Sequence, residues 1–264
     1  MDTGLRDKVV LVTGADNPRG IGAATARAFA REGAAVFASL LEEDDRDGVV
    51  RRIRDAGGRA DAARADLADP MAVPALFDAA ERALGPVDVL VVNAAHGETD
   101  SLLSLGPGVR DWARRSLQTI TPESHDAHFA VNSRATALLM AEYARRSAQR
   151  GAVWGRIITI STDGAHNFPG EVSYGASKAA LESYSRSAAS EFAPYGITVN
   201  IVSPGPIQTG WIPEGLEGEI AESIPMGRVG RPEDVADAIL LLATDQARWI
   251  TGQTIHVGGG HRMT

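Results

Sequence analysis

Short runs of apolar residues, many of them β-branched, alternate with longer amphipathic or alanine-rich stretches along this chain. The apolar runs predict strands over residues 9–12, 35–39, 60–65, 87–92, 156–161, 198–202 and 254–257. The longer stretches predict helices over residues 21–32, 46–56, 73–84, 122–147, 174–192 and 232–243. Apolar strands that alternate with helices are typical of a parallel sheet covered on both faces. The pattern therefore predicts an α/β fold with a doubly wound parallel sheet.

Two segments, 97–121 and 204–229, lack this regular pattern and are rich in Gly, Pro and Ser. In an open α/β sheet such connections leave the carboxyl ends of the strands, where ligands bind. We therefore expect both segments to border a binding site.

Composition and charge narrow the class of protein. The chain has 264 residues, 44% of them hydrophobic, which is enough to bury the core of a single domain over residues 1–264. The absence of cysteine excludes disulfides and thiolate metal sites. A net charge of -8 without a basic cluster argues against nucleic-acid binding. A polar N-terminus and the lack of a long apolar stretch predict a cytoplasmic protein without membrane association.

His125 and His128 lie three residues apart on a predicted helix, a spacing that can hold a metal ion. No third ligand is evident, and a solvated helix face explains the pair more simply. We therefore predict no metal site.

Tyr174 and Lys178 lie four residues apart at the start of a predicted helix, so both side chains point to the same face. A lysine ammonium beside a phenol favours the phenolate and would lower the pKa of Tyr174 toward the neutral range. Such a tyrosine would be a usable proton donor and acceptor. Ser161 and Thr162 end the preceding strand and add two candidate hydroxyl groups.

A glycine-rich turn follows the first predicted strand. Gly14 ends this strand, and Gly20-Ile21-Gly22 opens the next helix. Glycines at a strand-to-helix turn let backbone N–H groups approach a pyrophosphate at the positive end of the helix. Two extra residues separate Gly14 from Gly20 compared with the commonest spacing of this motif. Asp66, after the third strand, is placed to bond an adenine amine, and Asn93 closes the fourth strand at the same edge.

Taken together, these motifs resemble those of the short-chain dehydrogenase/reductase family. The resemblance spans nearly the whole chain and is closest to the 3-oxoacyl-(acyl carrier protein) reductase-like branch. The motifs are Thr13-Gly14, Gly20-Ile21-Gly22, Asp66, Asn93-Ala94-Ala95, Asn132, Ser161, Tyr174 to Lys178, Ser203-Pro204-Gly205, Thr209 and Ile250 to Gln253.

The resemblance implies a Rossmann-type fold and a role for each site residue. Tyr174 would protonate the carbonyl oxygen during reduction, and Lys178 would bind the nicotinamide ribose and lower the pKa of the tyrosine. Ser161 would bind the substrate oxygen, and Asn132 would hold a water that links Lys178 to solvent. The residues implied to bind the cofactor are Gly14, Arg19, Gly20, Ile21, Gly22, Asp66, Leu67, Asn93, Ala94, Tyr174, Lys178, Pro204, Gly205, Ile207 and Thr209.

The position of the carbonyl-binding hydroxyl stays open between two neighbours. Ser161 lies thirteen residues before Tyr174, the usual separation in the family. Counting forward from Gly155 instead selects Thr162. We favour Ser161.

The segment between Asn93 and Asn132 is longer than is usual in the family, with the surplus around residues 102–119. Three of its side chains, Trp112, Arg114 and Arg115, suggest that it covers the pocket or extends a subunit contact. The alternative is that the segment forms a solvent-exposed surface loop.

Cofactor choice depends on the end of the second strand. An acidic residue there would bond the adenosine ribose 2′-OH of NAD, and an arginine would pair with the 2′-phosphate of NADP. Leu40 and Leu41 do neither. Arg19 stands where NADP-dependent family members often carry a basic residue, whereas the acidic residues 42–45 would repel a phosphate. We favour NADP(H), with NAD(H) as the alternative.

We therefore predict an NAD(P)-dependent oxidoreductase that acts on a ketone or secondary alcohol, either a 3-oxoacyl thioester or a polar or cyclic ketone. The predicted substrate pocket contains His96, His166, Phe168 and Trp211. The alternative is a non-catalytic NAD(P)-binding sensor or scaffold. The resemblance also implies a homo-oligomer, a tetramer or dimer, with residues 249–257 in a subunit contact.

Overall fold

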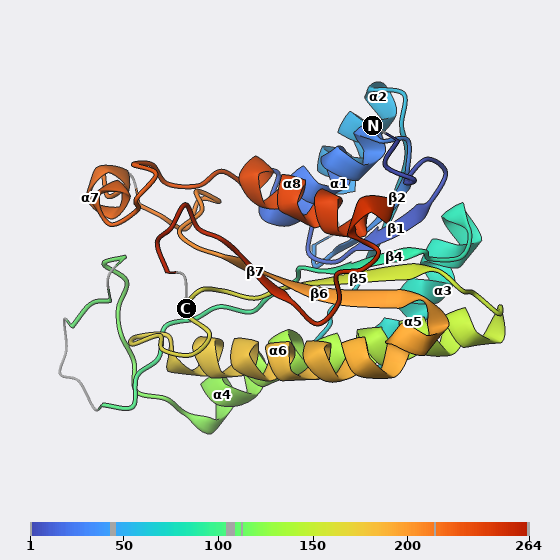
Figure 1. Cartoon of the computed structure of the whole chain (residues 1–264). Coiled ribbons are helices and arrows are strands. Elements are labelled where there is room, and N and C mark those ends of the chain that lie inside the picture. The colour runs from blue at the N-terminus through green and yellow to red at the C-terminus, as the bar shows by residue number, and fades with distance from the viewer. Residues whose placement is uncertain (1, 43–45, 104–108, 112, 214, 263–264) are drawn as a thin grey trace.

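The computed structural model describes residues 2–42, 46–103, 109–111, 113–213 and 215–262. Its strands form a parallel sheet in the order β3-β2-β1-β4-β5-β6-β7 (Figure 1). This arrangement confirms the predicted doubly wound α/β fold. The strands are β1 (Val9–Val12), β2 (Ala35–Leu40), β3 (Arg59–Arg64), β4 (Val89–Val92), β5 (Gly155–Ile160), β6 (Ile197–Pro204) and β7 (Thr254–Val257).

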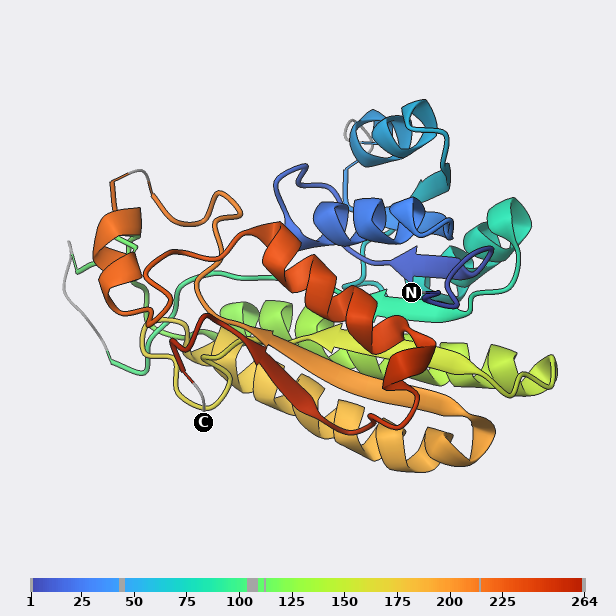
Figure 2. The ribbon, with the colours of Figure 1, turned by 45° about the horizontal axis from the view of Figure 1, so that its top comes forward.

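Helices cover both faces of the sheet (Figures 1 and 2). One face carries α1 (Ile21–Arg31), α2 (Arg46–Asp55) and α8 (Pro232–Ala243). The other carries α3 (Ala72–Leu84), α5 (Thr136–Gln149) and α6 (Val172–Phe192). None of the helices in the described ranges is long and apolar enough to cross a membrane.

The side chains of β1 show how the core is built. Val10 and Val12 pack in the core on the α1 and α8 face, and Leu11 packs in the core on the α3, α5 and α6 face. All three are completely buried. Because successive strand side chains point to opposite faces, a strand covered on both sides must be apolar throughout. This requirement explains the continuous apolar runs of the sequence.

Two helical features differ from the sequence prediction. The helix predicted over residues 122–147 is divided into α4 (Pro122–Phe129), a π-helical turn (Ala130–Ala135) and α5. A π-helical turn inserts a residue without ending the helix, so the apolar pattern does not report it. The structure also contains a helix that the pattern did not predict, α7 (Glu217–Glu222), within an irregular segment.

We expect Leu11→Ala to lower the free energy of unfolding by about 2–5 kcal/mol, because it opens a cavity in a fully buried strand. Leu103→Ala is the matched control, since the Leu103 side chain is exposed, and its effect should stay within about 0.5 kcal/mol. Urea unfolding followed by circular dichroism measures both. Equal effects of the two substitutions would contradict this description of the core.

Candidate active site

A cavity of about 1050 Å³ lies at the carboxyl ends of the strands, next to the point where the strand order reverses between β1 and β4. It brings together most of the site residues predicted from the sequence. Those that line it are Gly14, Gly20, Ile21, Gly22, Asp66, Leu67, Asn93, Ala94, His96, Ser161, Phe168, Tyr174, Lys178, Pro204, Gly205, Ile207, Thr209 and Trp211.

Three predicted residues lie outside this lining. Arg19 lines a neighbouring hollow of about 460 Å³ instead of the main cavity, and its role in cofactor binding stays a prediction. The turn after β5 leaves the His166 side chain 72% exposed, with Nε2 3.5 Å from Glu182, and its place in the substrate pocket stays a prediction. Asn132 is completely buried behind the cavity wall.

The glycine-rich turn fits a dinucleotide pyrophosphate. Gly14 has a φ of 68°, and a Cβ atom on Gly22 would lie 2.3 Å from the Gly14 carbonyl oxygen, so neither position accepts a larger residue without strain. Gly20 precedes α1, and no side chain caps its first N–H groups. These N–H groups are therefore open to an anionic group at the positive end of the helix.

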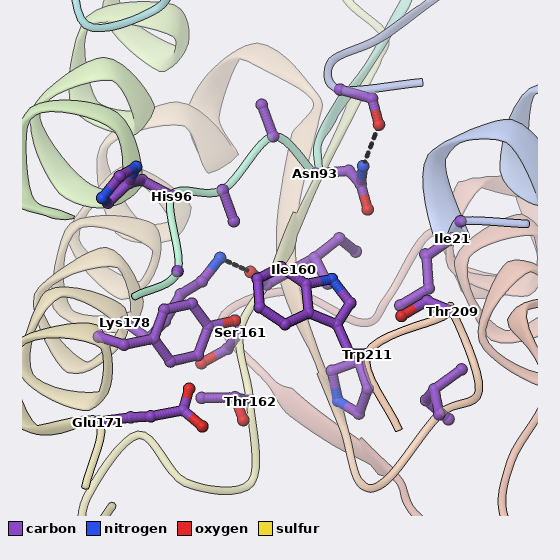
Figure 3. A pocket seen from close by; sticks show the side chains of 18 of the residues that line it. Ile21, Asn93, His96, Ile160, Ser161, Thr162, Glu171, Lys178, Thr209 and Trp211 are labelled. Carbon is purple, nitrogen blue, oxygen red and sulfur yellow. Dashed lines mark hydrogen bonds between the residues drawn. The ribbon is translucent and has the colours of Figure 1, made fainter. Parts of the chain in front are cut away.

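Asn93 holds this turn in place from the neighbouring strand. Its side-chain amide donates hydrogen bonds to the carbonyl oxygens of Thr13 (3.0 Å) and Gly14 (2.8 Å). The backbone N–H groups of Asn93 and Ala94 donate in return to the Thr13 hydroxyl. Asn93, which was predicted to bind the cofactor, thus shapes the turn through hydrogen bonds from its side chain to the backbone of the turn (Figure 3).

Lys178 lies in the wall of the cavity with its ammonium group held from behind. Its Nζ donates a 2.7 Å hydrogen bond to the carbonyl oxygen of Ile160, at the end of β5 (Figure 3). The residue is 1% exposed, and burial lowers its pKa to about 7. At neutral pH the lysine is therefore poised between its charged and neutral forms.

Tyr174 lies beside Lys178, whose Nζ is 5.7 Å from the centre of the phenol ring. Burial raises the pKa of Tyr174, and the carboxylates of Glu171 and Asp163 raise it further. The expectation that this pKa would be lowered is therefore not met in this structure, where burial and the two carboxylates raise it. The tyrosine is held as a neutral phenol, the form that donates a proton.

Asn132 joins three elements behind the reaction centre. Its side-chain oxygen accepts a hydrogen bond from the backbone N–H of His96 (2.8 Å). Its amide donates to the His96 carbonyl and to the Ser177 hydroxyl, both at 2.9 Å. The side chain therefore connects the π-helical turn, the segment after β4 and α6.

His128 fixes the same segment and is unavailable to a metal. Its Nε2 accepts from the backbone N–H of Glu98, and its Nδ1 lies 2.6 Å from the Ser124 carbonyl. Both ring nitrogens are thus engaged, and the residues described here contain no cluster of three or more metal-ligating side chains.

Ser161 and Thr162 end β5 but have different surroundings. The Ser161 hydroxyl donates a 2.7 Å hydrogen bond to the carboxylate of Glu182, a buried residue of α6. The Thr162 hydroxyl accepts from the backbone N–H of Gly164 and donates to no acceptor in the described chain. Both residues line the cavity, but only Thr162 keeps its hydroxyl hydrogen for a ligand.

The long segment between Asn93 and Asn132 reaches the cavity through Arg115, one of the three side chains singled out from the sequence. In the long segment, Arg115 pairs with Asp111 and Glu171, and its guanidinium lies 5.5 Å from the ring centre of Trp211. Part of the segment therefore does border the pocket, as the first of its predicted alternatives proposed. Trp112 lies outside the described residues. The sequence signals were the unusual length of the segment and its arginine and tryptophan side chains, whereas the partners of Arg115 could not be predicted.

The C-terminal residues also close part of the cavity. The Nδ1 atom of His261 lies 2.7 Å from Oδ2 of Asp163, the residue after Thr162. Arg262 donates to the carbonyl oxygens of Asp163 and Asn167. No pattern in the sequence connects positions almost one hundred residues apart.

A glycine-rich strand-to-helix turn and a buried lysine beside a tyrosine share one cavity at the reversal of a doubly wound sheet. This combination defines a nicotinamide-dependent oxidoreductase. The chain belongs to the short-chain dehydrogenase/reductase family, as its motifs predicted. A family model described as Enoyl-(Acyl carrier protein) reductase matches residues 14–262.

Individual relatives agree with this assignment. The chain is 37% identical over 266 residues to cis-4-hydroxycyclohexanecarboxylate dehydrogenase of Sinomonas cyclohexanicum, covering 99% of both chains. It is 37% identical over 265 residues to 3-oxoacyl-[acyl-carrier-protein] reductase of Synechocystis, again covering 99% of both. The crystal structure of a dehydrogenase/reductase from Sinorhizobium meliloti matches with a TM-score of 0.87 and 35% identity, over 100% of this chain and 99% of that one.

Replacing Lys178 should change stability in a pH-dependent way. The pKa falls from its ordinary value of 10.5 to about 7 on folding, so between these values the unfolded chain binds a proton that the folded chain lacks. The free energy of unfolding that is lost through this pKa shift is largest below pH 7, and the loss disappears above pH 10.5. We expect Lys178→Met to raise the free energy of unfolding by about 1–3 kcal/mol at pH 7, and by less at pH 10. Urea unfolding at both pH values measures this, and a gain that does not change with pH would contradict it.

Proposed function

We propose that the protein transfers a hydride between a nicotinamide cofactor and a ketone or secondary alcohol, with Tyr174 moving the proton. The observation that supports this most is the position of Tyr174 and Lys178 in the wall of the cavity that the glycine-rich turn also lines. The nicotinamide cofactor supplies or accepts the hydride when it is bound.

In the direction of ketone reduction, the neutral phenol of Tyr174 is the form that donates a proton. An alkoxide that develops on the substrate is more basic than a phenolate, so the neutral phenol donates its proton to that oxygen. Lys178, whose pKa is about 7, then returns a proton to the phenolate of Tyr174. Asn132 positions His96 and Ser177 around this centre.

We further propose that Thr162 is the hydroxyl that binds the substrate oxygen, rather than Ser161. The Ser161 hydroxyl is already committed to the carboxylate of Glu182, so donating to a substrate would leave a buried carboxylate oxygen without that partner. Thr162 has a free hydroxyl hydrogen at the cavity surface and stabilises the negative charge that develops on the carbonyl oxygen.

The substrate that we propose is a polar or cyclic ketone. Its pocket combines the aromatic side chains of Phe168 and Trp211 with the imidazole of His96 and the carboxylates of Glu171 and Asp163. These carboxylates favour a substrate with hydroxyl groups over a purely aliphatic acyl chain. The Sinomonas relative is named for a cyclic secondary alcohol, whereas the Synechocystis relative is named for an acyl substrate. The homo-oligomer and the cytoplasmic location stay predictions.

We expect Tyr174→Phe to lower ketone reduction by about 10²–10⁴-fold, because it removes the proton donor and keeps the ring. Fluorescence titration should show that the variant still binds the reduced nicotinamide nucleotide. Tyr184→Phe, on the exposed side of the same helix, is the control and should match the wild type. Wild-type turnover by Tyr174→Phe over a panel of ketones would rule out the proposed mechanism.

Substitution of the two neighbouring hydroxyls separates their roles. Thr162→Val should lower kcat by about 10²–10³-fold with little effect on folding, because a donor to the developing oxyanion is lost. Ser161→Ala should lower the free energy of unfolding by about 1 kcal/mol, because Glu182 loses a partner, and should change kcat far less. Steady-state kinetics and urea unfolding measure the pair. The reverse pattern would assign the substrate oxygen to Ser161.

A further inference from the structure

Asp16 lies in the lengthened part of the glycine-rich turn and lines the main cavity. Its Oδ1 atom accepts hydrogen bonds from the backbone N–H groups of Leu41 (2.5 Å) and Glu42 (3.3 Å), directly after β2. Its Oδ2 atom makes no hydrogen bond or ion pair within the described chain. The turn after β1 thus supplies a carboxylate at the end of β2, where the strand itself has only leucines.

This carboxylate lies where the adenosine ribose of a dinucleotide binds in a doubly wound fold. Ser39 and Leu41, at the end of β2, line the same cavity, and so does Asp66, which is predicted to bond the adenine amine. An acidic group at this place accepts a hydrogen bond from the ribose 2′-OH. The Oδ2 atom of Asp16 has the chemistry for that bond, which the Leu41 side chain lacks.

The carboxylate of Asp16 would also disfavour binding of a 2′-phosphate. The two backbone N–H groups beside it already donate to Asp16, so they are not available to phosphate oxygens. A phosphate placed there would also meet a like charge at short range, which costs free energy even in a solvated site.

The cationic side chains described near Asp16 do not offset this repulsion of a 2′-phosphate. Arg19 lines the neighbouring hollow with Arg27, Arg228 and Arg231 instead of the main cavity. Arg64 donates from Nε to the Leu41 carbonyl, and its side chain does not line the cavity. Residues 43–45, which were expected to repel a phosphate, lie outside the described residues.

We propose that the protein selects NAD(H) over NADP(H), and that Asp16 is the residue that makes this selection. The inference rests on the proposed function, because it assumes that the cavity binds a nicotinamide dinucleotide. It reverses the NADP(H) preference that the sequence suggested through Arg19.

The test is a fluorescence titration of the purified full-length chain with NADH and NADPH at one ionic strength. The wild type should bind NADH at least about ten-fold more tightly than NADPH, the ratio that corresponds to one charge repulsion of moderate strength. Asp16→Asn keeps the acceptor for the two backbone N–H groups and removes the charge. It should lower the NADH-to-NADPH affinity ratio by at least about five-fold, mainly by strengthening NADPH binding.

Two variants serve as controls. Asp66→Asn changes the adenine side, which both nucleotides share, so it should weaken both and leave their ratio unchanged. Arg19→Gln should also leave the ratio unchanged, because Arg19 lies outside the cavity. If Asp16→Asn does not fold, as judged by circular dichroism, Asp16→Ser replaces it, since serine keeps an acceptor oxygen and carries no charge.

The outcomes separate this inference from the proposed function. Tighter binding of NADPH by the wild type, or a ratio that Asp16→Asn and Asp16→Ser leave unchanged, would overturn the role of Asp16 while keeping the oxidoreductase. Loss of NADPH binding in Arg19→Gln would assign the selection to Arg19. A folded wild type that binds neither nucleotide would overturn the proposed function itself.

Discussion

The hydrogen bonds between Thr13 and Asn93 join the ends of β1 and β4 at the point where the strand order reverses. Because all the strands of the sheet are parallel, their carboxyl ends meet at this edge, and the brace holds the glycine-rich turn against its neighbour. A Cβ atom on Gly22 would lie 2.7 Å from the side-chain nitrogen of Asn93, so the brace leaves room only for glycine at this position. The shape of that turn leaves the first N–H groups of α1 open to an anion, and it places Asp16 at the end of β2.

Burial controls the charges at the other end of the cavity. The Ile160 carbonyl holds Lys178 in a site where burial brings its pKa to about 7, while Tyr174 stays a neutral phenol. The carboxylates of Glu171 and Asp163 reinforce this state, and each is itself held, by Arg115 and His261 respectively. The two ends of the cavity therefore differ in chemistry: one is built from backbone N–H groups and the other from buried ionisable side chains.

The fold and much of the site could be predicted from the sequence because they depend on local patterns. Apolar runs report strands buried on two faces, and the spacing of Tyr174 and Lys178 on a helix places both at the cavity. The π-helical turn at Asn132 was missed because one inserted residue leaves the apolar face continuous. The short α7 was missed because its segment has no sustained periodicity.

The sequence by itself determined the parallel sheet, the glycine-rich turn and the pair Tyr174 and Lys178. Only the tertiary structure decided which side chains face the cavity. Spacing favoured Ser161, but α6 places Glu182 against its hydroxyl and leaves Thr162 open. Arg19 matched a family position, yet the lengthened turn directs it to another hollow and brings Asp16 to β2 instead. The physical reason is that periodicity reports burial along one element, whereas the partner of a polar group is set by how distant loops pack.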